Sequence, residues 1–529
     1  MPHRPRIPSP GRRTVLRGSL LVPAAALPAA ASSAPALALA GRPEAAWGVQ
    51  VGSVTASSAL VWVRSDRPAR MLVETSATES FRRARSWYGP LIGPGGDFTG
   101  TTPLYGLPAG EQVHYRVTLA DPGDPRRTGK PVYGTFRTAP ARRRDGVRFL
   151  WSGDIAGQGW GINPDIGGYR VYEEMRRLDP DFFLCSGDTV YADGPLQPSV
   201  TLPDGRIWRN VMTEEKAKVA ETLDEYRGNF RYNLLDRNFR RFNAQVPSVV
   251  QWDDHEVRNN WYPGQILDDA RYTEKNVDIL AARSARAFHE YFPVSTPHGS
   301  ARRSRMYRAV HHGPLLDVFV LDMRSHRNRN SPNRQADDTT GILGAEQLRW
   351  LKRALAESRA VWKVIAADMP LGLVVPDGAT DFEAVAQGDP GAPLGRELQI
   401  AELLRFIKHR KVTGTLWLTA DVHYTSAQHY APSGRRSRIS HRSGSSSRAR
   451  WPQGISGQRA GRHVRARPCL RPGAGPGQCV ADGVAAVLRR GRDRRRQRGS
   501  DGTSAGGGWC GAVHQGAAAG PDRSVNDRR

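Results

Sequence analysis

Several short apolar runs in this chain end in residues whose side chains can bind metal ions. LCSGDTVYADG places Asp188, and three residues later Tyr191, directly after such a run. Three more segments share this pattern: SGD with Asp154, WDDHEVRNN at 252–260, and ADVHY with Asp421 and His423. An apolar run that stops at a turn is typical of a buried strand, and open α/β sheets bind ligands at the carboxyl ends of their strands. These side chains are therefore candidates for one shared site.

The ligand types indicate which ions this site would hold. Carboxylate, phenolate, amide and imidazole groups are hard or borderline donors, which favour Fe, Ca, Mn or Zn over Cu(I). One turn can present both Asp188 and Tyr191 to the same ion. Because the unperturbed pKa of tyrosine is about 10, phenolate ligation requires a strong Lewis acid, and ferric iron fits best.

Each motif taken alone also has a purely structural explanation. An aspartate at a turn commonly bonds the local backbone or caps a helix. A tyrosine or histidine after a strand commonly only packs against its neighbours. Four such strand ends in one chain favour the metal site.

The elements that must position these residues alternate along the chain. Apolar runs predict strands at 147–154, 181–188, 247–256, 315–327, 361–370 and 414–424. Amphipathic patterns predict helices at 168–178, around 214–242, at 344–358 and at 397–411. Strands that alternate with helices predict an α/β (layered α+β) fold, with helices outside the sheet.

The first part of the mature chain has a different pattern. Residues 46–140 contain short alternating strands separated by Gly, Pro and Asp clusters, which predicts a β-sandwich. RRRDG at 142–146 is a plausible linker. We therefore expect an N-terminal β-sandwich domain at 46–140 and a catalytic domain at 147–433.

The formal net charge of +26 is concentrated at the C-terminus. Residues 431–529 contain 21 Arg and 5 Asp but neither Lys nor Glu, so +16 of the charge lies there. The composition changes near Gly434, and three of the four cysteines also lie in this segment. The total charge is therefore weak support for a nucleic-acid partner.

Two explanations stay open for residues 434–529. Arg/Gly/Ser-rich composition is typical of a disordered tail. Alternatively, the segment is read in a shifted frame, because Arg442–Arg459 can be back-translated in another frame to the apolar FWEFVSGPLAPGHLGPT. We expect a frameshifted, disordered tail.

The N-terminus predicts export. GRRTVLRG, with Arg12 and Arg13, precedes an Ala-rich apolar run and a small-residue end near Ala40. We interpret residues 1–40 as a twin-arginine (Tat) signal peptide, since the run is short and Pro-interrupted for a membrane anchor. We expect no transmembrane span, and a secreted, extracellular or cell-wall-associated product.

GDTVYAD, WDDHEVRNN, LDMR and LTADVHY together resemble the PhoD-type alkaline phosphatases and phosphodiesterases, which belong to the metallophosphatase superfamily. The resemblance covers residues 46 to about 433 and implies a metallophosphatase sandwich with a small N-terminal β domain. It also implies Fe3+ with Ca2+ nearby. The back-translated FWEFVSGP resembles a segment of the same family.

The resemblance assigns roles residue by residue. It implies these metal ligands: Asp154, Asp188 as a bridge, Tyr191 on iron, Asp254, Asp421 and His423. His255 would steady the phosphate or the leaving oxygen, and Asn259 or Asn260 would contact phosphate or calcium.

Three further positions need separate treatment. Asp154 departs from the family, since better-known members place a cysteine at the end of the first strand. Cys185 would face away in an extended strand, so we expect it to pack rather than to replace that cysteine. Arg324 of LDMR is either a phosphate clamp or, as we favour, a salt-bridge partner of Asp322. Arg258 has the same two alternatives.

The implied activity is hydrolysis of extracellular phosphate mono- or diesters by a metal-bound hydroxide, which needs no serine nucleophile. Two alternatives stay open: a phospholipase- or nuclease-type phosphodiesterase on the same metal site, and a catalytically inactive exported binding protein. The expected partners are small-molecule or polymer phosphate esters and, during export, the Tat translocon. We expect no specific nucleic-acid partner, and the sequence leaves the oligomeric state open.

Overall fold

The computed structural model describes residues 41–142, 146–155, 159–202, 204–295, 305–337, 341–389 and 391–423, together with the backbone of five later strands. The predicted signal peptide at 1–40 lies outside the described residues. In the described part, none of the helices is long and apolar enough to cross a membrane.

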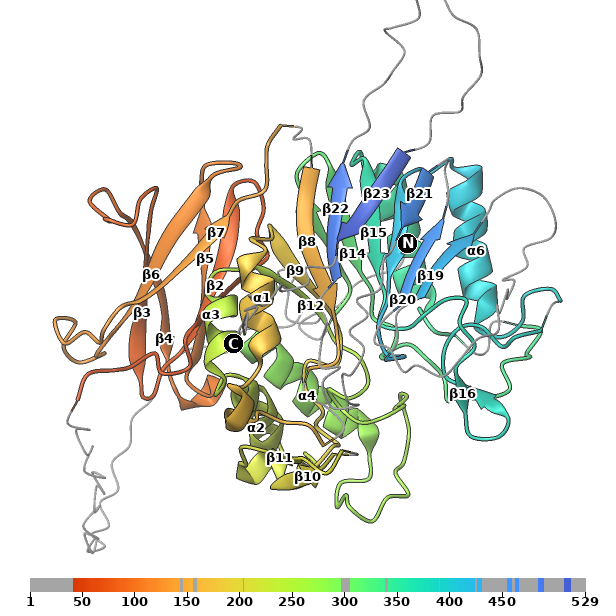
Figure 1. Ribbon diagram of the computed structural model, residues 1–529, viewed down its shortest axis with the longest axis horizontal. Helices are drawn as coiled ribbons and strands as arrows, with labels where there is room; N and C mark the ends of the chain where they lie inside the picture. Colours follow the sequence, from red (N-terminus) through yellow and green to blue (C-terminus); the bar gives the residue numbers. More distant parts are fainter. Residues whose placement is uncertain are drawn as a thin grey trace, which may run out of the picture. The chain divides into compact units, whose positions relative to one another are not determined.

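The N-terminal region forms the expected β-sandwich (Figure 1). One layer contains β1 (Val49–Gly52), β2 (Ser58–Arg64) and β5 (Thr99–Tyr105). The other has the order β4-β3-β6-β7 and contains β3 (Ala69–Ser76), β4 (Arg85–Ile92), β6 (Gln112–Ala120) and β7 (Val132–Arg137). In β6 every second residue is buried, because alternate side chains of a strand point to opposite faces. A shared core that includes Val61, Val73 and Val117 lies between the layers.

Two sheets form the centre of the following region, and the first of them continues the sandwich layer that contains β1. In this first sheet β8 (Gly146–Ser152), β9 (Phe182–Ser186) and β12 (Ser248–Gln251) are parallel, and β12 also pairs in parallel with β1. β14 (Leu316–Val320), β15 (Trp362–Ala366) and β18 (Thr415–Leu418) are parallel in the second sheet, which β13 (Arg308–His312) borders in the antiparallel direction. Phe149, Leu184, Val318 and Val364 belong to one core between the sheets.

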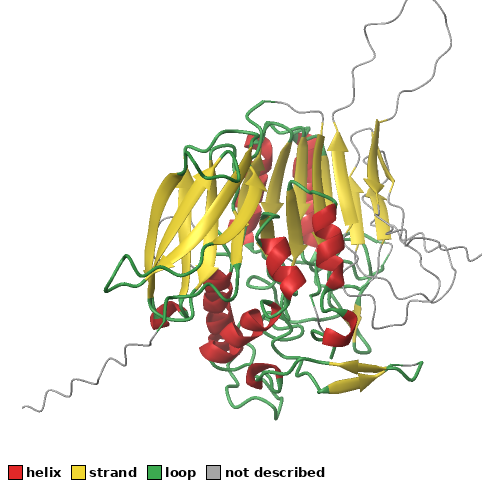
Figure 2. Ribbon diagram, turned by 60° about the vertical axis from the view of Figure 1, so that its left-hand side comes forward, coloured by secondary structure: helices red, strands yellow, loops and turns green. Residues whose placement is uncertain are grey.

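Helices cover the outer faces of these two sheets (Figure 2). The first sheet packs against α1 (Arg170–Arg177), α2 (Leu223–Asn233), α3 (Arg237–Asn243) and α4 (Val277–Tyr291). The second packs against α5 (Ala345–Glu357) and α6 (Glu397–His409). β9, β14 and β15 are therefore buried along their whole length, which explains their continuous apolar sequences. The α/β sandwich is confirmed.

Some elements differ from the sequence prediction. The predicted helix around 214–242 is divided into the 3₁₀ turn η3 (Glu214–Lys216), α2 and α3; Thr222 and Glu225 form a capping box at the start of α2. Helix α4 is absent from the predicted elements, although Val277, Leu280, Ala281 and Phe288 mark one apolar face. The small elements are η1 (Pro94–Gly96), η2 (Pro164–Ile166), β10 (Ser199–Thr201), β11 (Ile207–Arg209), β16 (Pro376–Asp377) and β17 (Asp381–Phe382).

Five late strands are described by their backbone alone: β19 (Ser426–Tyr430), β20 (Gly454–Gln458), β21 (Arg462–Arg465), β22 (Val484–Arg489) and β23 (Trp509–His514). β20 pairs with β18 and β22 pairs with β8, both antiparallel. Four of these strands, β20 to β23, lie in the segment that we expected to be disordered. The expectation of disorder therefore does not apply to these four strands. The physical reason is that β8 and β18 would otherwise leave backbone N–H and C=O groups unpaired. The shifted reading frame stays a prediction.

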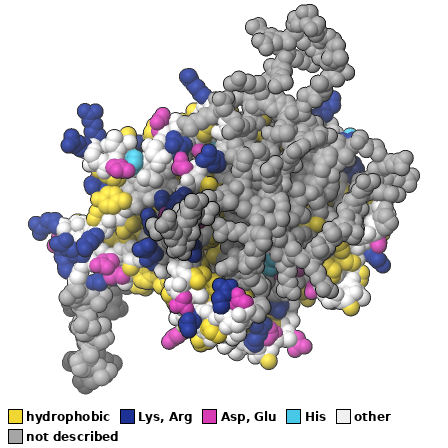
Figure 3. Space-filling model, viewed as in Figure 1, with side chains coloured by type: hydrophobic (Ala, Val, Ile, Leu, Met, Phe, Trp, Pro, Cys, Tyr) yellow, Lys and Arg dark blue, Asp and Glu magenta, His cyan; other side chains and the backbone are white. Residues whose placement is uncertain are grey.

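The surface charge of the described part is mixed on the face shown in Figure 3. Lys and Arg side chains lie among Asp and Glu side chains there rather than in one continuous patch. Much of the formal charge belongs to residues 431–529, whose side chains are outside the described part.

Helix α4 contains a partly buried histidine, His289, whose two ring nitrogens are buried and have no hydrogen-bond partner among the described residues. Burial and the nearby Arg308 cation lower the pKa of His289 to about 4. The pKa of an unfolded histidine is about 6.5, so the unfolded state binds more protons between these pH values. The free energy of unfolding should therefore be unaffected by this group above pH 6.5 and should fall by about 3 kcal/mol as the pH drops to 4.

His289→Phe should remove this acid-dependent loss, because phenylalanine keeps a ring but cannot be protonated. Urea unfolding of metal-free protein at pH 7 and pH 4.5 measures the difference between the variant and the parent. Equal pH dependence in the two proteins would contradict the assignment.

Candidate metal centre

The parallel strands bring the candidate residues to one edge of the two sheets. Asp154 follows β8, Asp188 follows β9, Asp254 follows β12 and Asp421 follows β18. Neighbouring parallel strands all end on the same side, where open α/β sheets bind their ligands. The sequence predicted four strand ends with candidate ligands at this edge. The structure places two more charged residues there, because Arg324 follows β14 and Asp368 follows β15.

The backbone at this edge is unusual for residues that carry a Cβ atom. Asp154, Asp188, Asn260, Asp421 and His423 have φ values of 59°, 46°, 56°, 75° and 54°. Left-handed backbone costs energy for such residues and concentrates at functional sites. At Gly187, which has a φ of 95°, a Cβ atom would lie 2.4 Å from the Cβ atom of Asp253, so glycine lets the β9 and β12 turns approach.

One group of ligands gathers around Asp154. The Nε2 atom of His423 lies 3.1 Å from Oδ1 of Asp154, and the Tyr191 hydroxyl lies 3.2 Å from this nitrogen and 3.4 Å from the same Asp154 oxygen. Candidate ligand atoms of Asp154, Asp188 and His423 all lie within 4.8 Å of one another. Oδ2 of Asp154 is buried without a hydrogen-bond partner. All four residues are among the ligands that the family resemblance implied, and we call Asp154, Asp188, Tyr191 and His423 the first cluster.

A second cluster shares one residue with the first. Candidate ligand atoms of Asp188, Asp254 and His255 also lie within 4.8 Å of one another. The Asn260 backbone N–H donates to Asp254 at 2.5 Å, and the Asn260 side-chain oxygen is buried without a partner. Asp188 therefore lies where a bridging ligand is needed, and the geometry favours Asn260 over Asn259 as a further ligand.

Asn259 and Arg258 lie at the margin of this cluster. The Asn259 backbone N–H donates to Asp193 at 2.8 Å, and the residue is otherwise exposed. Arg258 is half-buried, and its Nε atom has no partner. Their assignment to phosphate contact stays a prediction.

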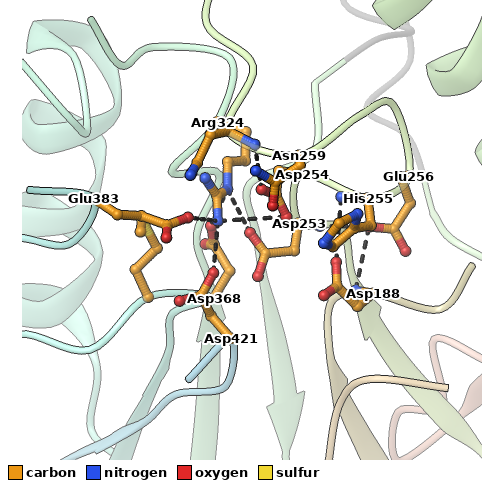
Figure 4. Close-up of polar contacts among 12 residues, drawn as sticks. Asp188, Asp253, Asp254, His255, Glu256, Asn259, Arg324, Asp368, Glu383 and Asp421 are labelled. Atoms are coloured by element: carbon orange, nitrogen blue, oxygen red, sulfur yellow. Dashed lines mark hydrogen bonds and ion pairs between the residues drawn. The ribbon is translucent and has the colours of Figure 1, made fainter. Parts of the chain in front are cut away.

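A third cluster consists of Asp253, Asp254 and Asp421, and Arg324 lies against it (Figure 4). The predicted salt bridge between Arg324 and Asp322 is wrong. The Asp322 carboxylate instead accepts the indole N–H of Trp252 and the backbone N–H of Arg324. The Arg324 side chain is 0% exposed and faces carboxylates, which does not support contact with a phosphate.

Three residues that were not predicted hold the ligand turns in place. The Glu256 carboxylate accepts the backbone N–H groups of Asp188 at 3.2 Å, Thr189 at 2.5 Å and Asp253 at 2.6 Å. It therefore ties the β9 turn to the β12 turn. The sequence signal was its position directly after the DDH triplet.

Asp193 and Lys216 hold the loop that carries Tyr191. Asp193 Oδ1 lies 2.7 Å from Nδ1 of His255, and the Lys216 ammonium donates to the Tyr191 carbonyl at 2.8 Å. Asp193 stands in the segment LCSGDTVYADG itself, whereas nothing in the sequence around Lys216 indicates its role.

Cys185 packs as expected. It is 1% exposed and belongs to the core between the first sheet and its helices.

The electrostatics of the edge favour bound cations. Burial raises the pKa of Asp188 well above its usual range, and the charges of Asp253 and Asp254 raise it further. Burial also raises the pKa of Tyr191 well above 10, together with the charges of Asp188 and Asp154. Burial alone would lower the pKa of His255, but Asp254 and Asp193 outweigh it and raise the value to about 9. Buried carboxylates this close need positive charge to stay ionised.

The donor set fits metal ions. Asp154 and Asn260 each have a buried oxygen without a partner, and all the groups are oxygen or imidazole donors. Two sheets packed face to face, helices on both outer faces and an acidic edge define a metallophosphatase-like α/β protein.

The sequence comparisons identify the group more closely. Residues 149–449 match the PhoD-like phosphatase family, and residues 30–140 match the N-terminal domain of PhoD-like phosphatases. The first match covers more than half of the 529 residues, so the chain belongs to the PhoD-like phosphatase family.

Individual proteins are also similar to this chain. Alkaline phosphatase D of Bacillus subtilis (strain 168) is 31% identical over 273 residues, which are 49% of this chain and 43% of the relative. The match thus spans less than half of that protein's length. The solved structure titled "Structure of PhoD" has a TM-score of 0.62 and 22% identity, and the match covers 85% of each chain. Purple acid phosphatase PPD1 of yellow lupin (Lupinus luteus) has a TM-score of 0.47 and 13% identity, covering 85% of this chain and 70% of its own.

Asp188→Asn tests the shared position of this carboxylate. Asparagine keeps the shape but removes the charge that both clusters use, so we expect the bound metal content to fall by about half or more. Elemental analysis after equilibration with iron(III) and calcium salts and then desalting measures the loss.

Asp165→Asn is the matched control, because Asp165 is an exposed partner of Arg209 outside the centre and should leave the metal content unchanged. Equal metal content in Asp188→Asn and the parent would contradict a shared ligand.

Proposed function

We propose that this protein is a metal-dependent phosphoric ester hydrolase that acts on phosphate mono- or diesters. The single observation that carries the proposal is the position of Asp188, whose carboxylate belongs to two adjacent ligand clusters. Two cations that share a ligand and lie about 3.5–4 Å apart form the arrangement that hydrolases use for displacement at phosphorus. Membership of the PhoD-like phosphatase family supports the same reaction class.

The residues suggest which ions are held. We assign Fe3+ to the first cluster, because the Tyr191 phenol is held protonated by burial and needs a strong Lewis acid to bind as phenolate. We assign Ca2+ to the second cluster, where Asp188, Asp254 and the Asn260 side-chain oxygen offer hard donors. When bound, such ions neutralise phosphoryl charge and lower the pKa of water toward about 7.

His255 is the residue best placed to act on the substrate directly. The Nδ1 atom of His255 is hydrogen-bonded to the Asp193 carboxylate, so Nε2 is the nitrogen that can donate to a phosphoryl oxygen or a leaving oxygen. With a pKa of about 9 the ring carries this proton at neutral pH. The Tyr191 ring stacks on it at 4.3 Å between centroids, which fixes the ring plane. Asp193 and Tyr191 thus orient a charged hydrogen-bond donor toward the ions.

The setting of the activity follows from the sequence. We propose that Arg12 and Arg13 direct export through the Tat translocon, and that the mature protein acts on extracellular phosphate esters. We further propose that residues 434–529 arose from a frameshift, so that the native protein carries a different C-terminus after the same candidate ligands.

Hydrolysis of p-nitrophenyl phosphate and bis-p-nitrophenyl phosphate tests the proposal on the full chain. Asp188→Asn should lower kcat/KM by about 10³-fold or more, since it removes charge stabilisation from both clusters. His255→Gln should lower it by about 10²-fold while the metal content stays near that of the parent. Asp165→Asn should match the parent. Full activity in Asp188→Asn, or an inactive parent with bound metal, would refute the proposal.

A further inference from the structure

The third cluster contains more acid than the other two. Five carboxylates surround the Arg324 guanidinium, which is the centre of the contacts drawn in Figure 4. Its Nη2 atom lies 2.9 Å from Asp421, 3.5 Å from Glu383 and 3.6 Å from Asp254. Its Nε atom contacts Asp253 and lies 3.4 Å from Asp368. The side chain is 0% exposed, so water does not screen these charges.

We propose that Arg324 is the resident cation of this cluster and takes the place of a third metal ion. The inference rests on the two-ion centre of the proposed function. Asp253 and Asp421 then pair with a guanidinium, and the protein binds two ions rather than three. Asp421 is a structural acid in this arrangement, not the metal ligand that the sequence suggested.

The contacts explain why a metal ion would not also fit. The oxygens of Asp253, Asp254 and Asp421 that could bind an ion lie within 4.8 Å of one another, but Arg324 already donates to two of them. A guanidinium is always charged and offers several N–H donors in a rigid plane, so one side chain can satisfy several carboxylates.

The first cluster shows the opposite situation. Among the described residues, Asp154 and Asp188 form no ion pair with Arg or Lys; the ion pair of Asp154 is with His423. Oδ2 of Asp154 is buried and has no hydrogen-bond partner in the described part of the chain. The protein therefore supplies its own cation to the third cluster and leaves the first open.

Two more buried arginines lie near enough to Arg324 to interact with its charge. Arg327 and Arg396 are each 1% exposed, and Arg396 donates to the backbone carbonyls of Phe382 and Ala384 and, from its other guanidinium nitrogen, to that of Asn328. Burial and the charges of Arg327 and Arg324 lower the pKa of Arg396 to about 8. A further divalent cation here would meet positive charge already in place.

The loops that meet at Arg396 come from two parts of the chain, 328–330 and 382–384, and the second also carries Glu383. Arg396 thus fixes the loop that carries Glu383, one of the five carboxylates around Arg324. Asp254 belongs to both the second and third clusters, and Nη2 of Arg324 lies 3.6 Å from its carboxylate. Arg324 is a positioning residue for the second ion through Asp254.

The count of bound ions tests the proposal. The full chain, saturated with iron(III) and calcium and then desalted, should contain two ions per chain by elemental analysis. Asp421→Asn should leave this count at two, because Asp421 pairs with Arg324. Three ions in the parent, falling to two in Asp421→Asn, would overturn the proposal while leaving the proposed hydrolase intact. Zero ions in the parent would overturn both.

Arg324→Gln gives the converse test. Removing the guanidinium leaves the carboxylates of the third cluster uncompensated, so this variant should bind one additional calcium ion, and calcium should raise its Tm by about 5 °C more than that of the parent. Arg308→Gln is the matched control: Arg308 is a buried arginine that bonds to backbone carbonyls and has no acidic cluster around it. It should show neither effect. A folded Arg324→Gln that keeps two ions and shows no additional calcium response would contradict the proposal, and the count in the parent and in Asp421→Asn decides it if Arg324→Gln does not fold.

Discussion

Burial of many carboxylates at one sheet edge is the constraint on which the rest of this structure depends. Asp188, Asp253, Asp254, Asp368 and Asp421 all lie between 0% and 9% exposed at the ends of parallel strands. Ionised groups this close repel each other, and the free energy of removing each from water is several kcal/mol. The folded protein can keep these carboxylates ionised only if cations lie between them. Arg324 supplies one such charge from within, and the first and second clusters call for ions from outside.

The same constraint accounts for the rigidity around the ligands. Glu256 binds N–H groups of two turns at once, and Lys216 and Asn233 hold the carbonyls of Tyr191 and Thr189 in the loop between them. Five ligand or candidate-ligand positions also keep left-handed backbone, a conformation that persists only where the surroundings enforce it. Repulsion between the carboxylates would push the turns apart if the sheet edge were flexible. The hydrogen bonds that restrain the turns oppose this repulsion until the cations bind.

The sequence predicted the strand ends well because local patterns determine them. Apolar runs followed by Gly and Asp mark β8, β9, β12 and β18, and parallel pairing then brings their ends together. Arg324 was paired with Asp322 because the two residues are close in the sequence. Its real partners, such as Asp253, Asp368 and Glu383, come from another sheet, another strand and a hairpin loop, and only the packing of the two sheets reveals them. Helix α4 was not predicted although its apolar face is regular, because it carries none of the strand-end motifs that mark the candidate site.

The C-terminal question can be separated from the site. Every candidate ligand lies between Asp154 and His423, before the composition changes near Gly434. In the described part of the chain, the later strands reach the centre through backbone pairing: β22 borders β8, β20 borders β18, and these two strands lead to the first cluster. Strand pairing uses backbone groups that any non-proline residue supplies, so a change of reading frame alters which side chains cover the two edges while leaving the ligand set unchanged. The stability and solubility of the product should therefore depend on its C-terminal sequence more strongly than the chemistry of the centre does.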